Sequence, residues 1–222
     1  MRTVIVQGLT MMMLCILTGL AGIAVVPYSP PPPPESLAGL VPGVSTVGDA
    51  IARYGEFDVA LPGHISYLIA GIPASKEYQW SVGNVLGRRA LSVETDIGGG
   101  IVNLVIVDQF PGLLTSRGLG VLMPESSIWR LYGMPDFAYE WRITLTDDPI
   151  LELIYVNQGL YIGLQRIPGR TNWMVTKLVL TYPAYLHNAV ALRTRQALTT
   201  PRVMDVSRSY RVWAQMADTP GG

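Results

Sequence analysis

The stretch Gly118–Asp136, GLGVLMPESSIWRLYGMPD, decides the fold, because an imperfect copy stands earlier in the chain at Gly39–Asp58, GLVPGVSTVGDAIARYGEFD. Both copies have the pattern of a turn, a short helix and then Tyr-Gly. The two tyrosines, Tyr54 and Tyr132, lie 78 positions apart. A repeat of this length predicts two tandem copies of one small supersecondary unit.

Local signals place the two helices. Thr46 is a favoured N-cap residue, and Pro124 suits the start of a helix. Each predicted helix runs from that residue to the tyrosine. It then stops at Gly55 or Gly133, because glycine readily adopts the positive φ that is common just after the last turn.

Apolar segments with strand character follow each helix. The expected strands are Glu77–Val82, Arg89–Thr95 and Ile101–Val107 in the first copy, and Leu151–Asn157, Leu160–Gln165 and Trp173–Tyr182 in the second. The predicted fold is α+β: an N-terminal transmembrane helix, then two tandem repeats over residues 37–108 and 109–183. Each repeat is a helix on a three-stranded antiparallel sheet. The second sheet is apolar on both faces, so we expect the other repeat or a partner protein to cover its open face.

The N-terminal segment predicts contact with a membrane. Residues 4–26 carry no charge and exceed the about 20 residues that a helix needs to cross a bilayer. Arg2 precedes them, which favours a cytoplasmic N-terminus and an extracytoplasmic remainder, that is, a single-pass protein of the cytoplasmic membrane. The alternative is a signal peptide cleaved after Ala24. Residues 27–36 include the five prolines Pro30–Pro34, which predict an extended linker.

Composition excludes several classes of protein. The 16 Lys and Arg balance the 16 Asp and Glu, so the chain lacks the strongly basic face of a nucleic-acid-binding protein. Cys15 is the single cysteine, which excludes an intrachain disulfide. Residues 184–222 are basic, and we interpret them as a tail with one helix over Ala184–Leu198. This tail is either solvated or docked onto the acidic domains or an anionic envelope polymer.

The sequence offers no catalytic constellation. The two histidines, His64 and His187, are far apart and lack a surrounding motif. The pair Ser126-Ser127 begins the second helix without a Gly-X-Ser-X-Gly elbow, and Asp147-Asp148 is a loop pair that would need distant oxygens to bind a cation. We therefore expect no enzyme activity, no metal and no small-molecule cofactor. A hydrolase would need a pocket that brings His64 to an acidic or hydroxyl side chain.

The tryptophans are the better indication of binding, because tryptophan is enriched at interface hot spots. Trp80 and Trp173 fall on predicted strands and are expected in the core. Trp129 and Trp141, expected on a helix surface and in the loop after it, are the predicted protein-binding residues.

The residues around the first helix resemble a known family. The phrase Pro-Gly-Val-Ser-Thr, a short helix, Arg-Tyr-Gly-Glu-Phe-Asp and a strand with Tyr-X-Trp are similar to bacterial envelope domains with a Gly-X-Thr, helix, Leu-Gly-X-Pro-Asp pattern. Relatives include the small lipoprotein of the outer-membrane β-barrel assembly machinery and the tandem-domain β-lactamase inhibitor protein. Tyr132–Asp136 matches the pattern best; Phe57 replaces the proline in the first copy, and no lipoprotein cleavage site surrounds Cys15.

This resemblance implies a helix-plus-sheet fold and a place in the cell envelope. We therefore expect a non-catalytic, membrane-anchored protein that acts as a protein-binding or scaffolding module outside the cytoplasmic membrane. The alternative is a secreted inhibitor or enzyme accessory protein released by signal cleavage.

Overall fold

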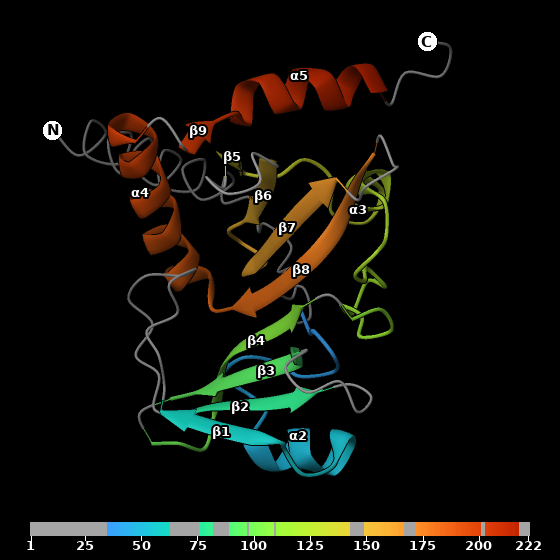
Figure 1. Cartoon of the computed structure of the whole chain (residues 1–222), viewed down its shortest axis with the longest axis vertical. Coiled ribbons are helices and arrows are strands. Elements are labelled where there is room, and N and C mark those ends of the chain that lie inside the picture. Colours follow the sequence, from blue (N-terminus) through green and yellow to red (C-terminus); the bar gives the residue numbers. More distant parts are fainter. Residues whose placement is uncertain are drawn as a thin grey trace, which may run out of the picture. The chain divides into compact units, whose positions relative to one another are not determined.

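The computed structural model describes residues 35–62, 76–81, 89–96, 98–108, 110–142, 149–166, 172–200 and 203–217, all within the compact unit Pro34–Gly222. The elements are α2 Val47–Tyr54, β1 Val59–Pro62, β2 Lys76–Ser81, β3 Arg89–Thr95, β4 Val102–Asp108, α3 Glu125–Tyr132, β5 Phe137–Arg142, β6 Pro149–Tyr155, β7 Leu160–Arg166, β8 Trp173–Thr181, α4 Pro183–Thr199, β9 Val203–Asp205 and α5 Ser207–Ala217 (Figure 1). The predicted membrane segment, residues 4–26, lies outside the described residues. None of the described helices combines the length and the apolar composition that crossing a bilayer requires.

The described strands form one nine-stranded antiparallel sheet in the order β1-β2-β3-β4-β8-β7-β6-β5-β9. The predicted fold class, with two separate three-stranded sheets, is therefore wrong. Each half contributes four strands, because β1 and β5 are present as well, and the halves join where β4 pairs with β8. An apolar edge strand exposes unpaired amides and carbonyls, and pairing two such edges satisfies both.

The joint between the halves has an approximate two-fold symmetry in its register. Trp80 and Tyr155, which bond the equivalent carbonyls of Gly55 and Gly133, pair with Leu91 and Leu160. Two residues farther along, Val93 pairs with Val105 of β4 and Ile162 pairs with Leu178 of β8, so Val105 and Leu178 occupy equivalent positions. Ile106 then corresponds to Val179, and these two residues face each other across the joint. An axis through this pair relates β1–β4 to β5–β8.

The repeated Tyr-Gly fixes each helix to the second strand of its half. Gly55 has a φ of 82°, and its carbonyl accepts a hydrogen bond from Nε1 of Trp80 at 2.9 Å. Gly133 has a φ of 72°, and its carbonyl accepts one from the hydroxyl of Tyr155 at 2.8 Å. In both halves an aromatic side chain of the sheet thus caps the end of the helix.

The aspartate that follows the Tyr-Gly accepts a hydrogen bond from the residue directly after this aromatic side chain. The carboxylate of Asp58 accepts from the amide of Ser81, and that of Asp136 accepts from the amide of Val156 at 2.7 Å. The repeated Tyr-Gly-X-X-Asp sequence therefore encodes a joint between helix and sheet, which explains why it recurs without implying any chemistry.

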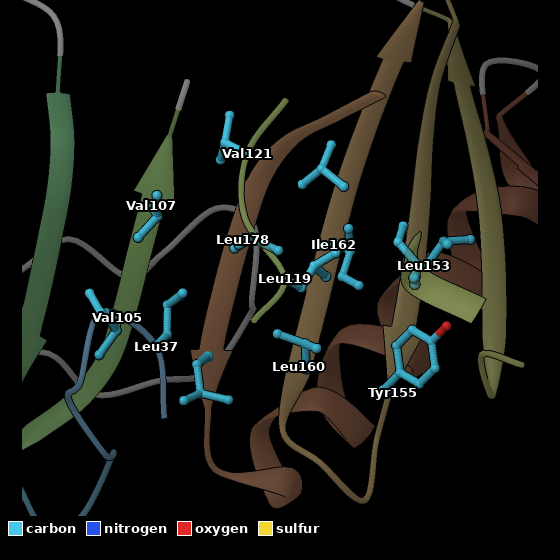
Figure 2. Close-up of a cluster of buried hydrophobic side chains, with 14 of the residues drawn as sticks. Leu37, Val105, Val107, Leu119, Val121, Leu153, Tyr155, Leu160, Ile162 and Leu178 are labelled. Atoms are coloured by element: carbon cyan, nitrogen blue, oxygen red, sulfur yellow. The ribbon is translucent and has the colours of Figure 1, made fainter. Parts of the chain in front are cut away.

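One face of the sheet is covered by α2, α3 and the segments that precede them. Leu37, Leu119 and Val121 lie over side chains of β4, β8, β7 and β6 (Figure 2). The buried side chains of these strands on this face include Val105, Val107, Leu153, Tyr155, Leu160, Ile162 and Leu178. Their exposed fractions do not exceed 1%, so this face carries the largest part of the apolar core.

The opposite face of the second half is covered by α4. Leu186 and Ala189 are buried in a cluster with Tyr139, Ile154 and Tyr161. Sequence analysis predicted that the other repeat or a partner would cover this face. The cover comes instead from the C-terminal segment of the same chain.

Residues 184–222 were expected to form a tail that is either solvated or docked, and the described part of this segment is docked onto the sheet. Strand β9 pairs with β5 and extends the sheet. The amide of Val206 donates to the carbonyl of Ala138 at 2.9 Å, and Tyr210 is only 6% exposed. The segment docks here because its backbone completes a sheet edge and the side chains of Val203 and Tyr210 are buried.

Candidate functional site

A cavity of about 650 Å³ lies between α3, the facing ends of β7 and β8, and α5. Its volume is in the range of about 300–1,000 Å³ that is common for ligand sites. Its chemically distinctive lining residues are Glu125 and Trp129 of α3, Glu140 of β5, Arg166 and Trp173 of the β7 and β8 ends, and Tyr210 of α5.

Glu125 is the distinctive group of this cavity. It lies in the first turn of α3, where the helix dipole favours an acid, yet it is only 4% exposed. Its Oε1 has no hydrogen-bond partner among the described residues, although the hydroxyl of Tyr210 hydrogen-bonds the carboxyl group. At the equivalent position of α2 stands Val47, an ordinary core residue. A titratable group in the wall of a cavity thus occupies the position that an apolar residue has in the other helix.

The environment of Glu125 changes its titration. Burial raises the pKa of this carboxyl to about 7, against the lowering effects of the Tyr210 hydrogen bond and the Arg166 charge. Burial also raises the pKa of Tyr210, so its hydroxyl stays protonated and donates to Glu125. A carboxyl with a strongly shifted pKa in a cavity is a candidate functional group.

Two tryptophans form the walls beside Glu125. Nε1 of Trp129 donates to the hydroxyl of Tyr210 at 2.7 Å, and the two rings meet edge to face with centroids 6.4 Å apart. The guanidinium Cζ of Arg166 lies 4.9 Å from the ring centroid of Trp173. No ion pair joins Arg166 to Glu125 in the described part of the chain.

The C-terminal helix completes the cavity. Tyr210, Val206 and Ser209 supply the wall opposite α3. Nη2 of Arg211 donates to the carbonyl of Asp136 at 2.7 Å, so α5 is fastened to the same Tyr-Gly-X-X-Asp segment that ends α3. The position of this wall therefore depends on α5.

The structure does not bring the two predicted binding residues together. Trp129 is half-buried and lines the cavity. Trp141 is not in a loop but in β5, packed against the cluster on the opposite face of the sheet. Its ring lies 4.0 Å from the Cζ of Arg193, and its Nε1 is buried without a hydrogen-bond partner among the described residues.

The residues considered for catalysis are equally scattered. His64 and Asp147-Asp148 lie outside the described residues. His187 is exposed on α4, while Ser126 lines the cavity and Ser127 is buried. The described residues contain no group of three or more His, Cys, Asp or Glu that could hold a metal ion.

A second carboxyl with a raised pKa lies in the other half. Glu94 of β3 faces Glu77 of β2 across the strand pair. Burial, and then the charge of Glu77, raise the pKa of Glu94 to about 7. Both side chains are buried, and Nε2 of Gln79 donates to Oε1 of Glu77 at 2.8 Å, so the two acids form a buried pair on one strand ladder.

Sequence reasoning missed Glu125, Arg166 and Tyr210. A signal for Glu125 was present, because aligning the two copies places this acid opposite Val47 in the apolar stripe of the other helix. Tyr210 carried no comparable signal, since its place depends on how α5 packs.

Comparisons with known proteins identify no family for this chain. No protein-family model matches the sequence, and no curated protein matches it. One similar solved structure is that of a DUF4309-family protein (YjgB) from Bacillus subtilis, with 14% identity and a TM-score of 0.33 over 65% of this chain and 82% of that chain. A likeness at this level carries no argument about fold or function.

Proposed function

We propose that this chain is a non-catalytic binding module, anchored in the cytoplasmic membrane by residues 4–26 and displayed outside it, and that the cavity beside Glu125 binds part of a protein partner. The observation that carries the proposal is a formed cavity with a buried, incompletely hydrogen-bonded carboxyl between two tryptophans. Leaving a buried polar group unpaired costs about 1–3 kcal/mol. An unpaired carboxyl that destabilises the fold and also lines a cavity is a candidate for contact with a bound ligand.

The lining residues favour binding over catalysis. A serine nucleophile needs a base within hydrogen-bond reach. Ser126 makes no hydrogen bond to a base among the described residues, although it lines the same cavity as Glu125. No histidine or cysteine is among the described residues that line the cavity.

Contacts of Glu35 hold the start of the described domain. Glu35 directly follows the proline run. Its carboxylate accepts from the amide of Ser116 at 3.1 Å and from the hydroxyl of Tyr132 at 3.0 Å, and forms an ion pair with Arg117 at 3.3 Å. Glu35 is thus held beside the end of α3 by three side-chain contacts.

Site-specific photo-crosslinking tests the binding site. A photoreactive amino acid at Ser126, which is exposed and lines the cavity, is expected to crosslink the full-length protein to a partner in cells. The matched control is position 48, the equivalent residue of α2, where an added Cβ meets nothing closer than Thr46 Oγ1 at 3.5 Å. The same crosslinks from both positions, or none from either, would contradict the proposal.

Fractionation tests the location. We expect the full-length protein in the membrane fraction, with its domain digested by protease added outside intact cells or spheroplasts. Recovery of the intact domain in the cytosol contradicts the proposal. A released form whose mature N-terminus is Val25 would instead establish the alternative, a secreted inhibitor or accessory protein.

A further inference from the structure

We propose that the group bound in the cavity is a lysine or arginine side chain of the partner protein, whose cationic head pairs with Glu125 between Trp129 and Trp173. This inference rests on the proposed function and adds the chemistry of the bound group.

The hydrogen-bonding state of Glu125 supports a cationic ligand. The carboxyl is 4% exposed and keeps Oε1 free of hydrogen bonds among the described residues, while it lines the cavity. A buried carboxylate is stable only when it is paired and hydrogen-bonded. An ammonium or guanidinium group supplies both the opposite charge and the missing donors.

The charges around the cavity also favour a cation. Glu125 and Glu140 are the acids among the described lining residues, and Arg166 is the base. The Arg166 side chain is exposed, so solvent screens its repulsion, whereas the buried Glu125 acts in a lower dielectric. Arg166 makes no ion pair with Glu125 among the described residues, so the carboxylate is not already neutralised.

The aromatic walls suit the same ligand. Cations are attracted to the faces of tryptophan rings. Trp173 already carries the guanidinium of Arg166 on its ring, and Trp129 lines the cavity from α3. A neutral ligand would also contact the tryptophan rings, but it would leave the negative charge of Glu125 without a positive partner.

Binding of a cation to Glu125 is expected to depend on pH. Arg166 of β7, Tyr155 of β6 and Tyr210 of α5 act electrostatically on this carboxyl, and Glu140 of β5 shares the cavity. With a pKa of about 7, Glu125 is protonated under acidic conditions, and the cation must then displace a proton. The affinity should therefore fall about tenfold per pH unit below pH 7 and become constant at higher pH.

Peptide binding to the full-length protein in detergent tests the inference. The probes are N-acetyl-Gly-Arg-Gly-amide, the lysine analogue, and the citrulline analogue, which has nearly the shape of arginine without its charge. At pH 8 we expect the arginine or lysine peptide to bind at least about tenfold more tightly than the citrulline peptide. Glu125→Gln should reduce binding to the citrulline level and remove the pH dependence. Glu140→Gln should keep the pH dependence.

Each other outcome decides against the inference. Equal affinity for the citrulline peptide, pH-dependent arginine binding that persists in Glu125→Gln, or no binding of either cationic peptide at about 10 mM overturns it. If Glu125→Gln does not fold, Glu125→Val replaces it, because valine is the residue of the equivalent helix position. Crosslinking from position 126 without cationic-peptide binding leaves the proposed function standing and removes only the ligand assignment.

Discussion

At the scale of the residue, the binding role proposed for Glu125 comes at the expense of stability. Its pKa is about 7 in the fold and 4.5 without the protein environment. The folded state therefore holds the proton more tightly, so the carboxyl destabilises the fold increasingly as the pH rises from 4.5 to 7 and by a constant amount above. We expect Glu125→Gln to raise the free energy of unfolding at pH 8 by about 1–3 kcal/mol, and to change it little at pH 4.

Urea denaturation at the two pH values measures this difference. The matched control is Glu140→Gln, which alters a carboxylate of the same cavity that is paired with Arg142 at 3.7 Å and partly exposed. Its effect should stay within about 0.5 kcal/mol at both pH values. A Glu125→Gln protein that is less stable than the parent at pH 8 would show that the carboxylate supports the fold.

At the scale of the element, the repeated aspartate provides a prediction with an internal control. Asp136 accepts from the amide of Val156, which is 4% exposed, so removing the acceptor leaves a buried donor unpaired. Asp136→Ala should lower the free energy of unfolding by about 1–3 kcal/mol. Asp58→Ala removes the equivalent bond to Ser81, but both residues are exposed and water replaces the acceptor. Thermal and urea denaturation should show a clearly smaller loss for Asp58→Ala, and equal losses would contradict the role assigned to burial.

Helix α4 depends on a buried ion pair. Nε of Arg193 lies 2.9 Å from Oε2 of Glu152, with side chains 4% and 5% exposed, and the hydroxyl of Tyr161 donates to Oε1 of the same carboxylate at 2.6 Å. Arg193→Met should cost about 3–5 kcal/mol, because it leaves a buried charge without its partner. Adding Glu152→Gln should recover most of this loss, since the remaining group is neutral and still accepts from Tyr161. A double variant as unstable as the single one would show that the loss comes from packing, for instance against Trp141.

Helices α2, α3 and α4 and six strands were accessible to sequence reasoning because their signals are local, whereas α5 was not predicted. The cap at Thr46 and the glycine stops appear in the structure as predicted. The strands that the pattern missed are those whose signals are weak or depend on distant partners. Val59–Pro62 has four residues and ends in proline, Phe137–Arg142 directly follows the Pro-Asp of the repeat, and Val203–Asp205 is a strand through its pairing with β5.

At the scale of the whole molecule, the sequence could reveal the repeat but not how its copies combine. Strand β4 is apolar on both faces, as is typical of a strand in the middle of a sheet. Which strand lies beside it is a non-local property that no periodicity records. The cavity was hidden for the same reason, since it needs α5 to pack near α3 across about 80 residues of sequence, far beyond the range of local signals.

The continuous sheet predicts that the two halves unfold together. Leu104, Val105 and Val107 of β4 and Leu178, Val179 and Leu180 of β8 are at most 1% exposed along the joint. Separating the halves would expose these side chains and break the β4–β8 ladder, so a state with one half folded should be strongly disfavoured. Hydrogen exchange of peptides from β2–β4 and from β6–β8, followed across a urea series, should report the same free energy of unfolding for both sets.

Val179→Ala provides the test at the joint itself. Val179 is fully buried and faces Ile106 on the approximate two-fold axis. The lost methyl groups should cost about 2 kcal/mol. If the molecule unfolds cooperatively, hydrogen exchange should report the same loss in the free energy of unfolding for β2 as for β6. Strand β2 belongs to the other half and lies two strands away from β4. A loss confined to the second half, or two separate unfolding transitions in the parent protein, would show that the sheet is continuous in geometry but that its halves are independent in energy.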